Sequence, residues 1–331
     1  MASNNTNPGN FANRPTEEVR EIASKGGQAS ASGNTENKGF ASMDPDKQHE
    51  IASKGGQASS GSFEPGSEEA REAGRKGGAA TGRVGTSNNY AYLVTDDKTK
   101  DAVIIDPANP PEVAPVLKKA IESGKINLTA IVNTHHHWDH AGGNKKLKSE
   151  LGLPDLAIIG GKDAEGVTRT PADGEGWKIG SIAVKGLYTP CHTQDSICWF
   201  MEDGGERVVF TGDTLFHAGC GKFFEGSAEE MNTALNKTLA ALPDDTSVFP
   251  GHEYTKSNVK FAASVLQNEA LRKLQEFAES HKETQGKFTI GDEKEHNPFM
   301  RTSDPKIQEV TGKTDPVEVM AKLREMKNNF K

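Results

Sequence analysis

Residues 135–140, with the sequence HHHWDH, carry the strongest metal-binding signal in this chain. They follow an apolar run, LTAIV, that reads as a buried strand. Because alternate side chains of an extended segment point the same way, His135 and His137 project together. Asp139 and His140 lie past the turn and face a second point. Imidazole and carboxylate donors suit zinc or iron better than calcium or magnesium. The spacing predicts a two-metal site, and a polar loop rich in histidine is the alternative.

Three more ligand-type residues follow apolar runs farther along the chain. His192, Asp213 and His252 each come after such a run and a short turn. Taken singly, each has an ordinary structural interpretation, such as a hydrogen-bonded histidine or a helix-capping aspartate. Together with the first cluster, they favour the additional ligands that a binuclear site needs.

From about residue 88 to residue 331 the chain resembles glyoxalase II, the hydroxyacylglutathione hydrolases of the metallo-β-lactamase superfamily. The His-x-His-x-Asp-His signature alone identifies only the superfamily. The Cys-Gly-Lys loop, the His-Glu-Tyr and the Asn-Pro-Phe-Met-Arg narrow the resemblance to glyoxalase II. The segments that carry it are NYAYLV (89–94), THHHWDHAGGN (134–144), FTGDTLFHAGCGKFFEG (210–226), GHEYT (251–255) and NPFMR (297–301).

The resemblance implies a ligand set for two divalent ions, with zinc expected and iron or a mixed pair as the alternative. One ion is held by His135, His137 and His192, the other by Asp139, His140 and His252, and Asp213 bridges both. A metal-bound hydroxide would attack the thioester carbonyl, and Asp139 would orient it as the catalytic carboxylate. Cys191 and Cys220 are alternative nucleophiles, but we expect both to be structural.

The resemblance also implies four contacts to glutathione, whose two carboxylates call for fixed cations. Arg324 and Lys327 are spaced i, i+3 on a predicted C-terminal helix and share one face. Outside this context such a pair is usually a solvated helix face. The four matching residues are Lys222, Tyr254, Arg324 and Lys327.

Three departures from the family pattern stand out. Phe224 replaces a tyrosine that hydrogen-bonds glutathione in many members, a loss of about 1 kcal/mol. Asp195-Ser196 replaces a Gly-His pair close to the third histidine ligand, where neighbours tune metal affinity. The residues before Asn88 leave no evident room for the family's first strand, so we expect an exposed sheet edge there.

The first 82 residues are a different kind of polypeptide, without Leu, Tyr, Trp or Cys. The segment EIASKGGQA occurs at residues 21–29 and 50–58, with a looser copy at residues 68–79. Each copy reads as a short helix that ends at its Gly-Gly pair. These Lys-Gly-Gly repeats resemble the stress-induced, including conidiation-specific, proteins of bacteria and fungi. A passive disordered tail is the alternative, because little apolar surface is available to bury.

The expected fold class is α/β, the metallo-β-lactamase αβ/βα four-layer sandwich. We expect a disordered or weakly helical repeat segment at 1–82, a catalytic domain at 83–255 and a C-terminal helical, glutathione-binding subdomain at 256–331. Eight strand-like runs divide into two groups of four, and an apolar stripe from Val259 to Phe277 predicts the helical part.

Composition excludes several classes of partner. The net charge is −8 with no basic stripe, so nucleic-acid binding has no electrostatic basis. No apolar run approaches the roughly 20 residues of a membrane span, and the N-terminus lacks a signal-peptide pattern. The three cysteines suit a reducing cytosol. We therefore expect a cytoplasmic protein, a monomer, whose partner is a glutathione thioester.

The sequence thus predicts hydrolysis of S-D-lactoylglutathione to D-lactate and glutathione, the second step of methylglyoxal detoxification. Two alternatives stay open. One is a sulfur dioxygenase of the same fold that uses a single iron. The other is a non-catalytic stress protein whose enzyme domain is impaired by loss of its first strand.

Overall fold

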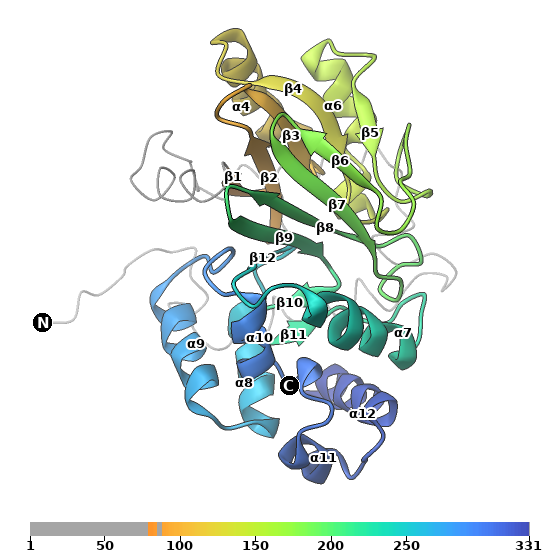
Figure 1. Ribbon diagram of the computed structural model, residues 1–331, viewed down its shortest axis with the longest axis vertical. Helices are drawn as coiled ribbons and strands as arrows, with labels where there is room; N and C mark the ends of the chain where they lie inside the picture. Colours follow the sequence, from red (N-terminus) through yellow and green to blue (C-terminus); the bar gives the residue numbers. More distant parts are fainter. Residues whose placement is uncertain (1–78, 85–87, 331) are drawn as a thin grey trace, which may run out of the picture. The chain divides into compact units, whose positions relative to one another are not determined.

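The computed structural model describes residues 79–84 and 88–330 of the chain. Apart from residues 79–82, the predicted repeat segment lies outside the described residues. Within the described part, two five-stranded sheets face each other and helices cover their outer faces (Figure 1).

The first sheet has the strand order β1-β2-β3-β4-β5. Its first three strands pair antiparallel, and β3, β4 and β5 run parallel. The strands are β1 (Ala79–Val84), β2 (Asn89–Thr95), β3 (Asp101–Ile105), β4 (Asn127–Val132) and β5 (Ala157–Ile159).

The predicted absence of a first strand is wrong. β1 pairs with β2 in a register that runs from Ala79 opposite Val94 to Val84 opposite Asn89. A strand ladder is made of backbone N–H and C=O groups, so small residues form it without large apolar side chains. The strand begins inside the Gly- and Ala-rich stretch, where residue preferences for strands are weakest. Sequence pattern therefore missed it.

The second sheet has the order β12-β9-β8-β7-β6, in which β12 and β9 are parallel and the other pairs antiparallel. A short hairpin, β10-β11, follows β9. The strands are β6 (Gly176–Ile179), β7 (Ile182–Tyr188), β8 (Ile197–Asp203), β9 (Glu206–Gly212), β10 (Leu215–Phe216), β11 (Gly219–Cys220) and β12 (Ser247–Pro250).

Three apolar clusters separate the layers. Leu117 of α4 (Pro110–Glu122) and Leu147 of α6 (Asn144–Leu151) pack on the outer face of the first sheet. Tyr92 and Trp199 belong to the cluster between the sheets. Helix α7 (Ala228–Thr233), continued by turns over Ala234–Thr238 and Leu239–Ala241, covers the second sheet together with the C-terminal helices. This is the αβ/βα four-layer sandwich that the sequence predicts.

The C-terminal part is helical, as predicted, but the apolar stripe from Val259 to Phe277 is divided between two helices. The break falls at residues 266–268, and the Asn268 side chain caps the second helix by accepting from the backbone N–H of Leu271. Among the described residues, no helix has the length and apolar character that a membrane crossing requires. The helices are α8 (Thr255–Val265), α9 (Glu269–Ser280), α10 (Ile290–His296), a 3-10 turn (Pro298–Met300), α11 (Pro305–Thr311) and α12 (Pro316–Asn329).

Candidate metal centre

The metal-binding side chains predicted from sequence come from loops that follow strands of both sheets. His135 and His137 follow β4, and the short helix α5 (Trp138–Ala141) carries Asp139 and His140. Three loops of the second sheet supply the rest: His192 follows β7, Asp213 follows β9 and His252 follows β12. The fold brings all seven side chains together.

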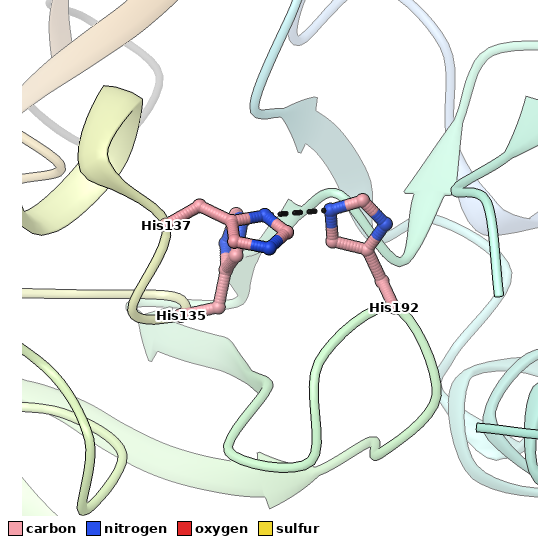
Figure 2. Close-up of side chains that lie close together, drawn as sticks. All are labelled: His135, His137 and His192. Carbon is pink, nitrogen blue, oxygen red and sulfur yellow. Dashed lines mark hydrogen bonds between the residues drawn. The ribbon is translucent and has the colours of Figure 1, made fainter. Parts of the chain in front are cut away.

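Three histidines converge on a first point. His137 Nδ1 lies 3.1 Å from His135 Nε2 and 3.1 Å from His192 Nε2. Figure 2 shows the His192 ring reaching from its own loop toward His135 and His137. Loops about 55 residues apart in sequence thus present nitrogen atoms to one small space.

A second point gathers two histidines and a carboxylate. His140 Nε2 and His252 Nε2 are 3.1 Å apart, and Asp139 Oδ2 is 3.7 Å from His252 Nε2. The three side chains form a separate group whose ligand atoms all lie within 4.8 Å of one another.

Asp213 lies between the two points. Its Oδ2 is 3.5 Å from His192 Nε2 and 3.3 Å from His252 Nε2, and its Oδ1 is 3.4 Å from His140 Nε2. Oδ1 is buried and has no hydrogen-bond partner among the residues that the structure describes. A Cβ on Gly251 would lie 2.5 Å from this oxygen, so only glycine leaves room for the carboxylate.

These separations fit divalent ions. Ligand atoms of a tetrahedral ion bound at the usual zinc distances lie about 3.3 Å apart. Six contacts between nitrogen and oxygen ligand atoms of the two points span 3.1 to 3.5 Å. The nitrogen pairs are within hydrogen-bonding distance of each other, and the same atoms could bind a cation once the protons between them are displaced. The chemistry of the donor set, nitrogen with carboxylate, also suits zinc or iron.

Burial sets the protonation of the first point. It lowers the pKa of His137 and His192, and lowers that of His135 well below its usual value. These rings are neutral near pH 7, which is the form that binds metal.

At the second point, opposite charges on neighbouring His and Asp side chains outweigh the effect of burial. Burial opposes a charge on His140, but Asp213 and Asp106 outweigh it and raise the pKa of His140 to about 9. Burial likewise opposes ionisation of Asp213, yet the neighbouring His252 and His140 hold its pKa well below the usual value. An incoming cation would displace the proton of His140.

Asp106 is a residue that sequence reasoning missed. Its Oδ2 lies 2.9 Å from His140 Nδ1, while Oδ1 accepts from the backbone N–H of Thr134. This pairing fixes the His140 ring with Nε2 toward the metal point. The available signal was a carboxylate directly after the apolar strand β3. The carbonyl of Lys222 acts in the same way on His192, at 2.9 Å from its Nδ1.

His136 lies outside the two metal points. Its Nδ1 is 2.8 Å from Oδ1 of the buried Asp195, and its Nε2 is 3.5 Å from Glu225. Asp195, one of the departures from the family pattern, therefore ties the loop of His192 to the loop of His135 and His137. Asp163 lies close enough to His136 and Asp195 for the three to form a further group of ligand-type atoms.

The predicted substrate contacts come from three parts of the chain. Tyr254 stacks on His252 with ring centroids 4.7 Å apart, and burial raises its pKa to about 12, so its phenol keeps its proton. Lys222 is exposed, on the loop after β11. Arg324 is buried on α12, donates to the carbonyl of Cys220 at 3.1 Å and has an unpaired Nε. Lys327 is half-buried on the same helix.

Phe224 occupies an unusual place for a large apolar side chain. It is 62% exposed, yet its ring lies 5.1 Å from that of His192 and 5.9 Å from that of His137. The side chain thus borders the metal centre without a polar atom to offer a ligand.

The cysteines lack the chemistry of a nucleophile. All three are free and buried. Burial raises the pKa of Cys191 to about 12 and that of Cys220 to about 11. Since the thiolate is the reactive form, both thiols are inert at neutral pH.

Comparison with known proteins agrees with this geometry. Residues 84–252 match the metallo-beta-lactamase superfamily and residues 253–330 match the hydroxyacylglutathione hydrolase C-terminus. A probable hydroxyacylglutathione hydrolase, glo2, of Schizosaccharomyces pombe is 54% identical over 244 residues, which cover 74% of this chain and 94% of glo2. The chain belongs to the hydroxyacylglutathione hydrolase family.

Other hydroxyacylglutathione hydrolases are nearly as similar. The cytoplasmic isozyme of Saccharomyces cerevisiae is 47% identical, over 73% of this chain and 94% of that enzyme. Among solved structures, ETHE1 from Myxococcus xanthus superposes with a TM-score of 0.55 at 26% identity, covering 76% of this chain and 90% of its own. Residues 10–30 and 39–60 match the stress-induced bacterial acidophilic repeat motif.

Proposed function

We propose that this chain hydrolyses S-(2-hydroxyacyl)glutathione thioesters, converting S-D-lactoylglutathione to D-lactate and glutathione in methylglyoxal detoxification. The observation that carries the proposal is the convergence of seven His and Asp side chains on two adjacent points that share Asp213. Family membership supports the same reaction.

The protein side chains would hold and orient the reactants. Two divalent ions bound at these points would supply a hydroxide at neutral pH and polarise the thioester carbonyl. His135, His137 and His192 would hold one ion, Asp139, His140 and His252 would hold the other, and Asp213, which lies between the two points, would serve both. Asp139, partly open to solvent, would also accept a hydrogen bond from the attacking hydroxide and orient it. The leaving thiol has a pKa near 8.5, so no general acid is required.

Fixed cations would bind the two carboxylates of glutathione. Arg324 keeps part of its guanidinium unpaired, and Lys222 projects from the loop beside His192. Tyr254 offers a protonated phenol beside the metal centre. Lys327 adds a second positive charge close to Arg324 on the same helix.

The proposal extends to the identity of the metal, the oligomeric state, the location of the protein and the roles of its parts. We propose zinc as the ion, with iron or a mixed pair as the alternative, and a monomer that works in the cytoplasm. We assign catalysis to residues 83–255 and glutathione binding to residues 256–331. The repeats would be a stress-related appendage or a passive tail.

The test is hydrolysis by the purified full-length protein. The absorbance of S-D-lactoylglutathione is followed while metal content is measured on the same sample. Turnover with about two ions per chain supports the proposal. Absence of turnover in a protein that has been loaded with metal would refute it.

The alternatives predict different results. A one-iron sulfur dioxygenase would bind a single ion and consume oxygen, but the second group, Asp139, His140 and His252, favours two ions. The idea of an impaired, non-catalytic domain rested on a missing first strand. Because β1 is present and pairs with β2, this reason for expecting an impaired domain no longer holds.

A further inference from the structure

The hairpin β10-β11 lies in the chain between Asp213, the proposed bridging ligand, and the loop that carries Lys222. It starts two residues after Asp213 and ends two residues before Lys222. Only two residue pairs form its ladder, and the turn places Ala218 at a φ of 54°, a region that a residue with a Cβ enters at a cost. So short a hairpin depends on outside contacts for its shape.

Two buried side chains of the C-terminal part supply some of these contacts. Glu293 of α10 accepts from the backbone N–H of Ala218 at 3.1 Å. Asn297 donates to the carbonyls of Phe216, at 3.2 Å, and Gly219, at 3.0 Å. In Figure 1 the hairpin lies among the helices that provide them.

Asn258 of α8 makes a further contact to the hairpin and differs from Glu293 and Asn297. Its side chain is 2% exposed, and Nδ2 donates to the carbonyl of His217 at 3.1 Å. Its Oδ1 accepts a hydrogen bond from the ammonium group of Lys327 on α12. One buried amide thus joins the hairpin to a cation of the C-terminal helix.

Gly219 allows the amide to lie in this position. A Cβ at residue 219 would lie 2.7 Å from both Cγ and Nδ2 of Asn258. Hydrogen bonds to His217 and Lys327 hold the amide in place. The amide could therefore move away from such a Cβ only by losing one of these two hydrogen bonds. Phe261 completes the surroundings of Lys327, with its ring centroid 5.5 Å from Nζ.

We propose that Asn258 is a positioning residue for substrate binding. It holds the ammonium of Lys327 against the hairpin through one of its three donors, which leaves the other two for a carboxylate of glutathione. An unrestrained lysine loses more side-chain entropy when it binds, and a pre-ordered one binds more tightly for that reason. The inference rests on the proposed function, because that function supplies the glutathione carboxylate that Lys327 would bind.

We expect Asn258 to affect the affinity for substrate and not the rate of turnover. The amide has no contact with the His and Asp side chains of the metal centre among its hydrogen bonds, which go to His217 and Lys327. Arg324 reaches the same hairpin directly, through the carbonyl of Cys220. Arg324 and Lys327 are therefore both placed by the hairpin, and Lys327 is placed through Asn258.

The experiment compares Asn258→Ala, Lys327→Ala and the double variant in the full-length, metal-loaded protein. KM and kcat are measured with S-D-lactoylglutathione, and the Kd is measured calorimetrically with S-methylglutathione, a thioether that cannot be hydrolysed. Lys322→Ala is the matched control, since Lys322 lies on the exposed side of α12 and pairs with Glu325.

We expect Asn258→Ala to raise KM and Kd roughly tenfold, as loss of a hydrogen bond to a charged group does, with kcat and metal content unchanged. The double variant should bind no more weakly than Lys327→Ala alone. Gly219→Ala, which displaces the amide without removing it, should give the same KM increase. This variant guards against misfolding of Asn258→Ala.

Three results would overturn the inference. The effects of Asn258→Ala and Lys327→Ala could multiply in the double variant, kcat could fall along with affinity, or the wild-type protein could fail to bind S-methylglutathione. Wild-type protein that binds S-methylglutathione but hydrolyses no thioester would refute the proposed function alone, and the Kd values would still decide the role of Asn258.

Discussion

His140 Nε2 and His252 Nε2 lie 3.1 Å apart although 112 positions separate the two residues in the chain. His140 belongs to a loop of the first sheet and His252 to a loop of the second. The centre can therefore form only when the two sheets face each other in their native arrangement, so metal binding and folding are coupled.

Removing the bridging carboxylate should remove the activity. Asp213→Ala takes away the one side chain shared by both points. We expect kcat/KM to fall by more than the roughly 10–100-fold that loss of an outer partner costs, with substoichiometric metal. Thioester hydrolysis and metal analysis check this. Asp155→Asn, an exposed acid, is the control, and full metal content in Asp213→Ala would contradict the assignment.

Asp106→Asn should weaken metal binding while the protein stays folded. The amide would present a donor to His140 Nδ1 in place of an acceptor, favouring the tautomer with a proton on Nε2. We expect metal affinity to fall about 10–100-fold, measured by competition with a chelator. Asp97→Asn at the exposed turn after β2 should have no effect. Unchanged affinity in Asp106→Asn would show that the pairing is incidental.

Substrate binding should weaken as pH rises through about 8. Burial, with the charge of Arg324, lowers the pKa of Lys327 to about 8. Below that pH the ammonium binds a carboxylate, and above it the charge is lost, so kcat/KM should fall while kcat holds. Lys327→Arg stays charged throughout and should lose this decline. The same decline in both proteins would assign it to another group.

Glu293 should contribute stability that acid removes. Burial opposes its ionisation, but His296 and His217 outweigh burial and hold its pKa below the ordinary 4.5. The lowered pKa means that this stability is present above pH 4.5 and is lost as pH falls below it. We expect Glu293→Gln to cost about 3 kcal/mol at pH 7, measured by denaturant unfolding. The gap to wild type should narrow in acid.

The matched control for Glu293 lies on the same helix. Glu295 has a side chain that is 70% exposed, so Glu295→Gln should shift the free energy of unfolding by less than about 0.5 kcal/mol. A gap between Glu293→Gln and wild type that stays constant from neutral to acid pH would mean that the ionised carboxylate is not what stabilises the fold.

Cys191→Ser should leave hydrolysis nearly intact. Burial raises the pKa of this thiol to about 12, so almost none is thiolate at neutral pH. The hydroxyl can still donate to the carbonyl of Ser227, the partner of the thiol at 3.2 Å. A loss of kcat on the scale of a missing nucleophile, on the order of 10⁶-fold, would reopen covalent catalysis.

The sequence by itself determined the donor set and its order. His135, His137, Asp139 and His140 are close in the chain, so their convergence follows from local geometry at a strand end. The apolar runs also predicted two groups of strands, because burial imposes its period on the sequence, and the family resemblance implied the four-layer sandwich. The strand β1 was missed, since its ladder needs only backbone groups and its first four residues, Ala79 to Gly82, are small.

Only the tertiary structure decided which distant groups act on that donor set. Asp106, Lys222 through its carbonyl, and Asn258 reach their partners across 34, 30 and 69 residues. Such contacts depend on how sheets and helices pack, and no local period of the chain records packing between remote segments. The physical reason is that side-chain type is written in sequence, whereas the distance between two side chains exists only once the chain has folded.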